Sequence, residues 1–451
     1  MLINLLSFAS VMKTVGGVAL AIVILLAMVT IHEFGHYIAG KLLGFKINEF
    51  AVGFGPAILK KRSKKTGILF ALRAIPLGGY CAFDGEDYDE EDKKAEQEKA
   101  QEDKEEPFEE MQAEKTQKSE NEGGMAETKT ETNSAPSVTK SEKSEEKQGE
   151  KEEEYPQPQG ARFNEQAPWK RIIVLIAGAT MNYLLALFLI VLMFAITGRP
   201  AYAVTKGEIP DGALPNSVAV QSYNEGLKTG DIVLKINGKT LYTAMDWLDA
   251  LDGKKKGEQV DVLVIRDGEK QTISVALIED AVVKNMSDNS AIFFSLGIAA
   301  REEVDGKMQL TRGGGLEAES VRDGFFQTIG HSFVYSFKLG GSVLRSLGEL
   351  LTGKLGISAM GGPVTTISVT AEAASSGFAS FMNIAALIGV NLAVFNLLPV
   401  PALDGCKVIF CTIEWIRKKP LNRKVETIIN LAGLIFLFGF AILVDILHFI
   451  L

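Results

Sequence analysis

The stretch from Val15 to Gly40 constrains the fold most, because it begins with an apolar run long enough to cross a membrane. No charged residue occurs between Val15 and Ile31. A helix over this stretch, rising about 1.5 Å per residue, spans a hydrocarbon core about 30 Å thick. The run ends in His-Glu-Phe-Gly-His at positions 32–36. Since ionisable residues inside a membrane span are costly, the stretch predicts a transmembrane helix that carries a functional site.

The spacing of the two histidines predicts a metal site. His32 and His36 are four residues apart and project from one face of a helix, where two imidazoles can bind one zinc ion at about 2.0–2.1 Å. Glu33 lies beside the first histidine and can take a proton from a water at the metal. Two other interpretations are weaker: a pair of hydrogen-bonded core histidines, and a signal peptide, which needs a shorter apolar run and a small-residue cleavage site.

The charge of the chain is divided unevenly. The 451 residues are 47% hydrophobic and 23% charged, with a net charge of −9, which suggests apolar spans joined by polar segments. Residues 84–154 hold 27 acidic and 11 basic residues, a net of −16, and the remainder holds 29 acidic and 36 basic, a net of +7. A mildly basic remainder suits an anionic membrane surface. The three cysteines form no Cys-x-x-Cys pair, so a zinc site needs nitrogen and oxygen ligands.

Three further apolar runs predict transmembrane helices at about 172–196, 378–398 and 428–447. Asn182, in the second run, must face another helix or the metal site, most simply as an interhelical hydrogen bond. Basic residues cluster after the first run and before the fourth: Lys41, Lys46, Lys60, Lys61, Arg62, Lys64, Lys65 and Arg73, then Arg417, Lys418, Lys419, Arg423 and Lys424. By the positive-inside rule these clusters are cytoplasmic, so both termini are predicted outside and the metal near the cytoplasmic edge.

Two segments between the first two runs differ sharply. Residues 47–83 alternate in hydrophobicity between turn residues, which predicts a small β-sheet beside the metal site. Its edge could pair with an unwound substrate segment, or the sheet could merely plug the site. Residues 84–154 have almost no large apolar side chains, so they cannot offset the entropy of ordering and are predicted to be disordered. A solvated spacer is favoured there over a docking role.

The chain between the second and third runs predicts a β-rich domain and an amphipathic helix. Val260–Ile265 and Thr272–Ile278 flank an Asp-Gly turn at 267–268 and predict a hairpin. Ala244–Leu251 predicts a short helix. Apolar residues at steps of three, four and seven from Asp323 to Leu351 predict an interfacial helix, on which His331 is more simply structural than a ligand.

Asp404 is the predicted third metal ligand. Pro399 and Pro401 end the third apolar run and leave backbone carbonyls unpaired at membrane depth. A carboxylate beside such a break favours a cation, and two histidines, one aspartate and an open water position form a catalytic zinc site. The alternative is that Asp404 only caps the next helix.

Three motifs resemble those of the site-2 protease family: His-Glu-Phe-Gly-His at 32–36, Ile-Pro-Leu-Gly-Gly-Tyr at 75–80, and Asn-Leu-Leu-Pro-Val-Pro-Ala-Leu-Asp-Gly at 396–405. Gly-Leu-Lys-Thr-Gly-Asp-Ile at 226–232 looks like part of a circularly permuted PDZ domain, as in bacterial family members that regulate sigma factors. The likeness covers nearly the whole chain except residues 84–154.

The resemblance implies an intramembrane zinc endopeptidase. In it, His32, His36 and Asp404 bind Zn²⁺ and Glu33 is the general base. The family also implies substrate-binding roles at the matching positions, namely Asn391, Asn396, Gly53, Gly55, Pro399 and Pro401.

We therefore expect a polytopic α-helical membrane protein with four transmembrane helices, a membrane-associated β-sheet and an extracytoplasmic PDZ-like β-rich domain. The expected parts are the first span with its sheet at 1–83, the disordered acidic insert at 84–160, the second span at 161–200, the PDZ-like domain at 201–300, a linker and amphipathic helix at 301–376, and the last two spans at 377–451.

The expected function is cleavage of transmembrane segments of pre-trimmed single-pass membrane proteins, such as anti-sigma factors or remnant signal peptides, in the bacterial inner membrane. The PDZ-like domain would gate the site or bind a ligand, and no nucleic acid is involved. One alternative is a non-catalytic scaffold or chaperone that binds transmembrane helices. Another is a metal transporter, but a single ligand set beside a general base offers no chain of sites across the bilayer.

Overall fold

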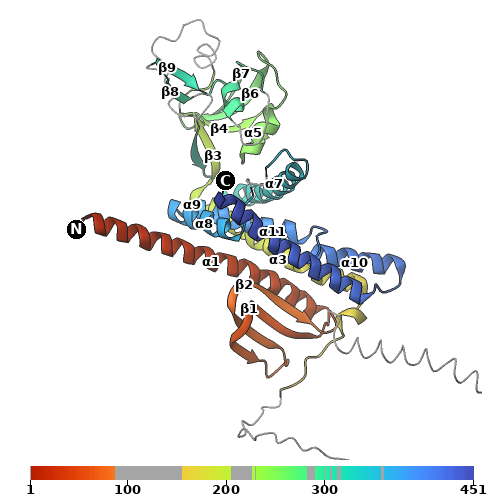
Figure 1. The fold of residues 1–451 in the computed structure, drawn as a ribbon. Helices are drawn as coiled ribbons and strands as arrows, with labels where there is room; N and C mark the ends of the chain where they lie inside the picture. Colours follow the sequence, from red (N-terminus) through yellow and green to blue (C-terminus); the bar gives the residue numbers. More distant parts are fainter. Residues whose placement is uncertain are drawn as a thin grey trace, which may run out of the picture.

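The computed structural model describes residues 2–86, 155–204, 226–228, 230–281, 290–298, 300–304, 307–311, 316–356 and 360–450. A bundle of helices lies between two β structures, a small sheet on one side and a β-rich domain on the other (Figure 1). All but the first three residues of the predicted disordered insert at 84–154 lie outside the described residues. The insert's disorder therefore stays a prediction.

Four helices of the described chain are long and apolar enough to cross a membrane, as predicted. They are α1 (Leu2–Leu42), α3 (Pro168–Thr197), α9 (Phe378–Asn396) and α11 (Arg423–Ile450). Helix α3 is central, because it packs against α1, α9, α10 and α7. Its first residue is Pro168, whose fixed φ and missing N–H suit the first position of a helix.

The bundle buries one face of each helix and exposes the other. Met28, Ile190 and Ala385 belong to one apolar core shared by α1, α3 and α9. Helix α11 is largely exposed along its length, with large apolar side chains such as Ile435 and Phe436 on its surface. An apolar exterior of this kind is stable only where lipid covers it.

Three further helices join the spans. The amphipathic helix predicted at Asp323–Leu351 is confirmed as α7 (Phe325–Leu351). Helix α8 (Pro363–Ser376), which the sequence analysis did not predict, follows it. Its amino terminus receives Asp445 of α11, whose carboxylate accepts hydrogen bonds from the Val364 N–H at 3.0 Å and the Thr365 hydroxyl at 3.0 Å. Helix α10 (Asp404–Arg417) follows α9 in the chain and packs against α3.

The predicted sheet at 47–83 is confirmed as β1 (Ile47–Arg62) and β2 (Leu69–Phe83), and both strands bend. The bends give four segments in the spatial order 79–83, 47–52, 69–73, 57–62. The first two and the last two of these pair antiparallel, and the middle pair, 47–52 with 69–73, runs parallel. Gly53 and Gly55 lie at the bend of β1, both with positive φ. Arg73 holds this bend by donating to the Gly55 carbonyl oxygen at 2.7 Å and to Glu49 Oε1 at 2.6 Å.

The β-rich domain is built on one sheet in the order β10-β3-β4-β6-β7, with β5 paired to β4. The strands are β3 (Arg199–Val204), β4 (Ile232–Ile236), β5 (Lys239–Thr240), β6 (Gln259–Arg266), β7 (Glu269–Ala276) and β10 (Leu316–Val321), and a separate pair is β8 (Ala300–Val304) with β9 (Lys307–Thr311). The predicted hairpin is confirmed as β6–β7, whose turn residues Asp267 and Gly268 both have positive φ.

Two short helices complete the domain and one of them connects it to the bundle. Helices α5 (Ala244–Leu251), at the predicted position, and α6 (Ser290–Ser295) close the domain core around Trp247 and Leu248. Side chains before and on α5 reach α7: Tyr242 hydrogen-bonds to His331, Lys338 pairs with Asp246, and Arg345 Nη1 lies 2.9 Å from Asp249 Oδ1. The domain therefore sits on the amphipathic helix.

Candidate metal centre

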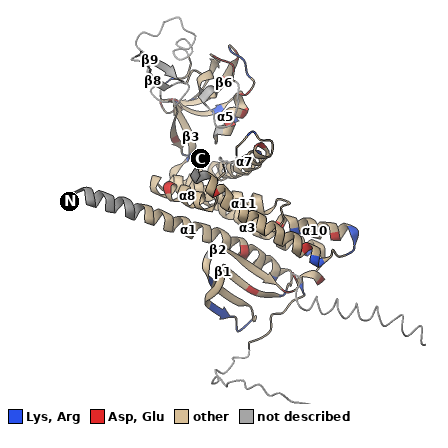
Figure 2. Ribbon diagram, viewed as in Figure 1, with Lys and Arg blue, Asp and Glu red and all other residues tan. Residues whose placement is uncertain are grey.

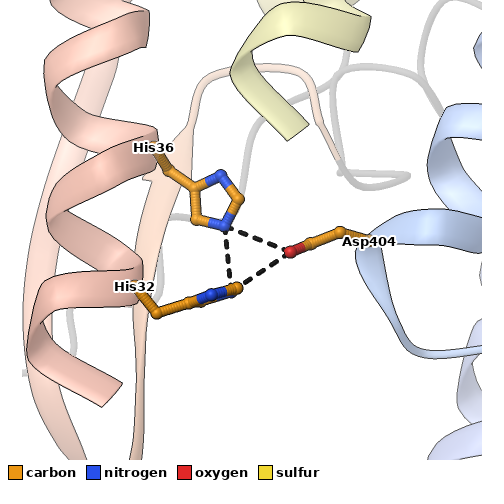
Figure 3. Close-up of side chains that lie close together, drawn as sticks. All are labelled: His32, His36 and Asp404. Atoms are coloured by element: carbon orange, nitrogen blue, oxygen red, sulfur yellow. Dashed lines mark hydrogen bonds and ion pairs between the residues drawn. The ribbon is translucent and has the colours of Figure 1, made fainter. Parts of the chain in front are cut away.

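Three side chains from two helices bring their ligand atoms together in the bundle (Figure 3). Asp404 Oδ2 lies 3.1 Å from His32 Nε2 and 3.3 Å from His36 Nε2, and the two nitrogens are 3.2 Å apart. A tetrahedral zinc ion with bonds of about 2.0–2.1 Å holds its ligand atoms about 3.3 Å apart. The triangle therefore has the size of one face of a zinc coordination shell.

The hydrogen bonding around the triangle also favours a cation. His36 Nδ1 lies 2.8 Å from the Val174 carbonyl oxygen, which only accepts, so Nδ1 carries the proton and Nε2 offers a lone pair. Asp404 Oδ2 is buried and makes no hydrogen bond with the described residues. A lone pair and a carboxylate oxygen facing each other in a buried site repel unless a cation lies between them. The residues present thus fit a zinc ion.

Asp404 reaches the centre because the chain turns sharply after α9. Helix α9 ends at Asn396, and the following turn includes Ala402 with a φ of +75°. A Cβ on Gly405 would lie 2.3 Å from the Leu398 carbonyl oxygen, so only glycine lets α10 begin this close to the turn. Asp404 is the first residue of α10. The Asp-Gly pair is thus explained: the aspartate faces the histidines and the glycine permits its approach.

Gly178 allows α3 to lie against the two histidines. A Cβ at this position would be 2.3 Å from His36 Nε2 and 2.8 Å from His32 Cε1. Any larger side chain would occupy the space where the imidazoles meet. The small residue in the second span therefore permits the metal centre itself, beyond simple helix packing.

A polar cavity of about 360 Å³ opens on the triangle. It is lined by His32, Glu33, His36, Tyr80, Cys81, Ala82, Phe83, Glu86, Leu175, Asp404 and Lys407. The β2 segment 79–83 forms one wall, and a Cβ on Gly79 would lie 3.2 Å from Glu33 Cγ. The sheet is thus pressed against the predicted general base. Within the described chain, one edge of segment 79–83 pairs with β1 and no strand pairs with its other edge.

The sequence analysis missed both members of a charged pair that lines the cavity. Lys407 Nζ lies 2.7 Å from Glu86 Oε1, and this ion pair lines the cavity beside the triangle. Lys407 follows Asp404 by three residues on α10, so helical spacing could have found it. Nothing marked Glu86, which is one acidic residue among many. The Val174 carbonyl is a backbone group, for which the sequence carries no signal.

None of the predicted substrate-binding residues lines the described cavity. Asn391 lies on α9, and its Oδ1 is buried with no hydrogen-bond partner in the described chain. Asn396 is the last residue of α9. Pro399 is exposed in the turn, and Pro401 packs against Gly433 of α11. Gly53 and Gly55 lie at the bend of β1. Their substrate role stays a prediction.

Most of the chain is similar to a known peptidase family and to proteins of Bacillus and Geobacillus. Residues 20–440 match the model of peptidase family M50. The regulator of sigma-W protease RasP of Bacillus subtilis is 27% identical over 432 residues, which cover 92% of this chain and 94% of that protein. The zinc metalloprotease RasP of Bacillus licheniformis is 26% identical, with 91% and 93% covered. The zinc metalloprotease RasP of Geobacillus kaustophilus is 26% identical, with 96% of both chains covered.

Proposed function

The chain belongs to peptidase family M50, the site-2 proteases, and is a zinc metalloprotease; from this premise we propose that it cleaves peptide bonds inside transmembrane segments. The substrates are single-pass membrane proteins already trimmed outside the membrane, such as anti-sigma factors or remnant signal peptides, as in regulated intramembrane proteolysis. The sigma-W regulator among the relatives supports the first class. The four apolar helices place the protein in a bilayer as a multi-pass membrane protein.

The converging triangle beside Glu33 carries this proposal. His32, His36 and Asp404 hold the zinc ion, because their ligand atoms match its coordination distances. Bound zinc supplies Lewis-acid chemistry, polarising the scissile carbonyl and making water more acidic. Glu33, in the same cavity, accepts the proton of the attacking water and delivers it to the leaving amine nitrogen.

The bent sheet presents the substrate in an extended form. A helical amide is hydrogen-bonded within its own helix, so the substrate must unwind before water can attack. The outer edge of segment 79–83, next to Glu33, offers backbone groups to which an extended chain can add as a strand. Asn391, Asn396, Pro399 and Pro401 at the end of α9, together with Gly53 and Gly55, guide the unwound segment to this edge.

The sidedness follows from the charges. Lys and Arg gather at the α10–α11 turn and at the outer end of the β1–β2 sheet, while the helices between are mostly uncharged (Figure 2). By the positive-inside rule this end is cytoplasmic, with the active site near it. The β-rich domain then lies outside the cytoplasm. It is a PDZ-like gate that excludes substrates with bulky outer domains, and its contacts with α7 hold it above the bundle.

Replacing Glu33 by Gln tests the proposed chemistry. The variant keeps the ligand triangle but has no proton acceptor, so cleavage of a single-pass substrate in detergent is abolished while zinc content stays at one ion per chain. His36→Ala is the matched control, since it removes a ligand and lowers the zinc content. Full proteolysis by Glu33→Gln would rule out the base assignment, and full zinc content in His36→Ala would rule out the ligand set.

Removing residues 202–278 tests the proposed gate. If the β-rich domain gates the site, the shortened protein cleaves substrates whose outer domains are intact. If the domain instead recognises a newly formed carboxyl terminus, cleavage of every substrate is lost. The comparison uses one substrate with and without its outer domain, measured by the appearance of the cleaved membrane fragment.

A further inference from the structure

We propose that Asn182 is a positioning residue for the metal centre: its amide oxygen accepts the Nδ1 proton of His32 and thereby keeps His32 Nε2 free to bind the metal. This inference rests on the proposed ligand set. It gives a specific role to a polar residue that the sequence placed within an apolar span.

The side chain of Asn182 is fully buried on α3 and directed at His32. Its Nδ2 lies 3.4 Å from His32 Nδ1, and its Oδ1 is buried with no hydrogen-bond partner among the described residues. The oxygen and nitrogen of an amide are assigned from their hydrogen bonds, because their shapes are nearly the same. Exchanging them places Oδ1 at His32 Nδ1 and puts the amide nitrogen where the unpartnered oxygen is now. The exchanged orientation is the one that suits a metal ligand, because a His32 that binds a metal through Nε2 carries its proton on Nδ1 and needs an acceptor there.

The other histidine supplies an internal comparison. His36 Nδ1 donates to the Val174 carbonyl oxygen at 2.8 Å, which leaves its Nε2 facing the triangle. Val174, Gly178 and Asn182 follow one another at intervals of four residues, so they occupy one face of α3. That face supplies an acceptor to each histidine, a backbone oxygen to one and a side-chain oxygen to the other, with Gly178 making room between them.

The chemistry requires such acceptors. A neutral imidazole carries one proton, and the nitrogen that binds a metal must be the other one. A hydrogen bond from Nδ1 fixes the tautomer and the ring orientation and strengthens Nε2 as a ligand. Without an acceptor at Nδ1, the proton can move to Nε2 and the ring can turn. Loss of such a partner weakens metal affinity by about 10–100-fold.

The opposite orientation makes a different prediction. If the amide N–H donates to His32 Nδ1, the proton is held on Nε2 and the residue opposes metal binding. Asn182→Asp separates the two cases, because a carboxylate accepts hydrogen bonds but cannot donate them when ionised. Asn182→Leu, of similar size, neither accepts nor donates.

The experiment measures zinc affinity of the full-length protein in detergent, by competition with a chelator. We expect Asn182→Leu to bind zinc about 10–100-fold more weakly, and Asn182→Asp to bind at least as tightly as the parent. The visible spectrum of bound Co²⁺ reports the ligand geometry independently of activity, and it should be kept in the Asp variant and altered in the Leu variant. Thr180→Val is the matched control, because Thr180 is exposed on the same helix and its hydroxyl bonds, within the described chain, only to the Ile176 carbonyl.

Each outcome is decisive. Tighter zinc binding by the Leu variant than by the parent shows that the amide donates and opposes the metal. Equal loss of affinity in the Asp and Leu variants shows that accepting a hydrogen bond is not what Asn182 contributes, and unchanged affinity in the Leu variant shows that Asn182 positions nothing. If the Leu variant fails to fold, weaker zinc binding by the Asp variant than by the parent overturns the proposal, and binding at least as tight supports it. His36→Ala in the same assay checks the ligand set, so its failure is separable from failure of the Asn182 proposal.

Discussion

The six-stranded sheet of the β-rich domain and the smaller β1–β2 sheet are built for different surroundings. The sheet of the β-rich domain packs against Trp247 and Leu248 and buries Val260 and Val262 completely. The β1–β2 sheet exposes large apolar side chains instead, and Leu59 is 65% exposed. The first sheet therefore carries its own core, whereas the second depends on the helix it packs against and on lipid or substrate.

This difference in burial indicates a different role for each sheet. A sheet with a closed core is stable by itself and can serve as a rigid body above the bundle. The bent β1–β2 sheet instead packs residues such as Ile47 and Phe83 into a core that it shares with the helices, and beside Glu33 it has a free edge of backbone hydrogen-bonding groups. The following predictions test this contrast.

The largest effect is expected where the β1–β2 sheet touches α1 beside Glu33. A Cβ on Gly79 would lie 2.8 Å from the Ala51 carbonyl oxygen and 3.2 Å from Glu33 Cγ, so Gly79→Val must displace the strand or Glu33. A displacement of about 1 Å lowers activity about 100-fold. We expect cleavage to fall at least that far while zinc content and the melting of the β-rich domain stay unchanged. Gly341→Ala, on α7 with open space around it, is the control and should retain full activity.

The second prediction compares one substitution in two places. Leu248→Ala, at a position 1% exposed in the β-rich core, should destabilise that domain by about 2–5 kcal/mol. Leu59→Ala in the β1–β2 sheet should change stability by less than about 0.5 kcal/mol, because its side chain has no core to leave. Urea unfolding followed by limited proteolysis measures both. A large loss at Leu59 would show that the sheet has a core of its own.

A smaller effect is expected at the bend of β1. Arg73 joins the Gly55 carbonyl to the Glu49 carboxylate, so Arg73→Met should loosen the bend without unfolding the sheet. Cleavage should fall several-fold, less than in Gly79→Val, and amide hydrogen exchange should rise across residues 53–59. Unchanged exchange there would mean that the glycines hold the bend without the arginine.

The smallest effect concerns the contact between the β-rich domain and α7. Burial lowers the pKa of His331. The positive charges of Arg199, Lys235 and Lys270 lower this pKa further, and the negative charge of Asp323 raises it. The folded state thus favours neutral His331, whose ring meets the Tyr242 hydroxyl. The contribution of neutral His331 to the stability of the folded state is complete above the ordinary pKa of about 6.5, and it is lost as the pH falls through the lowered pKa of the folded state.

When the pH is lowered from 7 to 5, across the ordinary histidine pKa of about 6.5, the protection factors of the α7 amides against hydrogen exchange should therefore fall slightly. His331→Asn removes the titrating group and should flatten the response. A contact that tightens on acidification would contradict the neutral form, and would indicate that Asp323 dominates.

Much of the fold could be read from local patterns. The four apolar runs, the Asp-Gly hairpin turn and the periodicity of α7 each depend on neighbouring residues, and each is confirmed. Helix α8 was missed because its sequence, Pro363–Ser376, is rich in threonine, alanine and serine and carries no strong periodic stripe. Its amino terminus is satisfied instead by Asp445, which is 80 residues away along the chain.

The candidate site was predictable in composition but not in its surroundings. The sequence predicts the ligands from two histidines on one helical turn and from an Asp-Gly pair after a broken helix. Helix geometry and metal chemistry limit what such residues can do. Glu86 and the Val174 carbonyl could not be recognised as neighbours of the centre, since their positions depend on how α3 and the end of β2 meet the helices that carry the ligands.

The sequence by itself determined the number of spans, the spacing of the metal-binding side chains and the separation of an acidic insert from a basic remainder. These depend on hydrophobicity and on helical periodicity, which are local. Only the tertiary structure decided that Asp404 meets both imidazoles, that Gly79 presses a strand edge against Glu33, and that one face of α3 meets both histidines. Such contacts join residues far apart in the chain, and they arise from packing several elements at once.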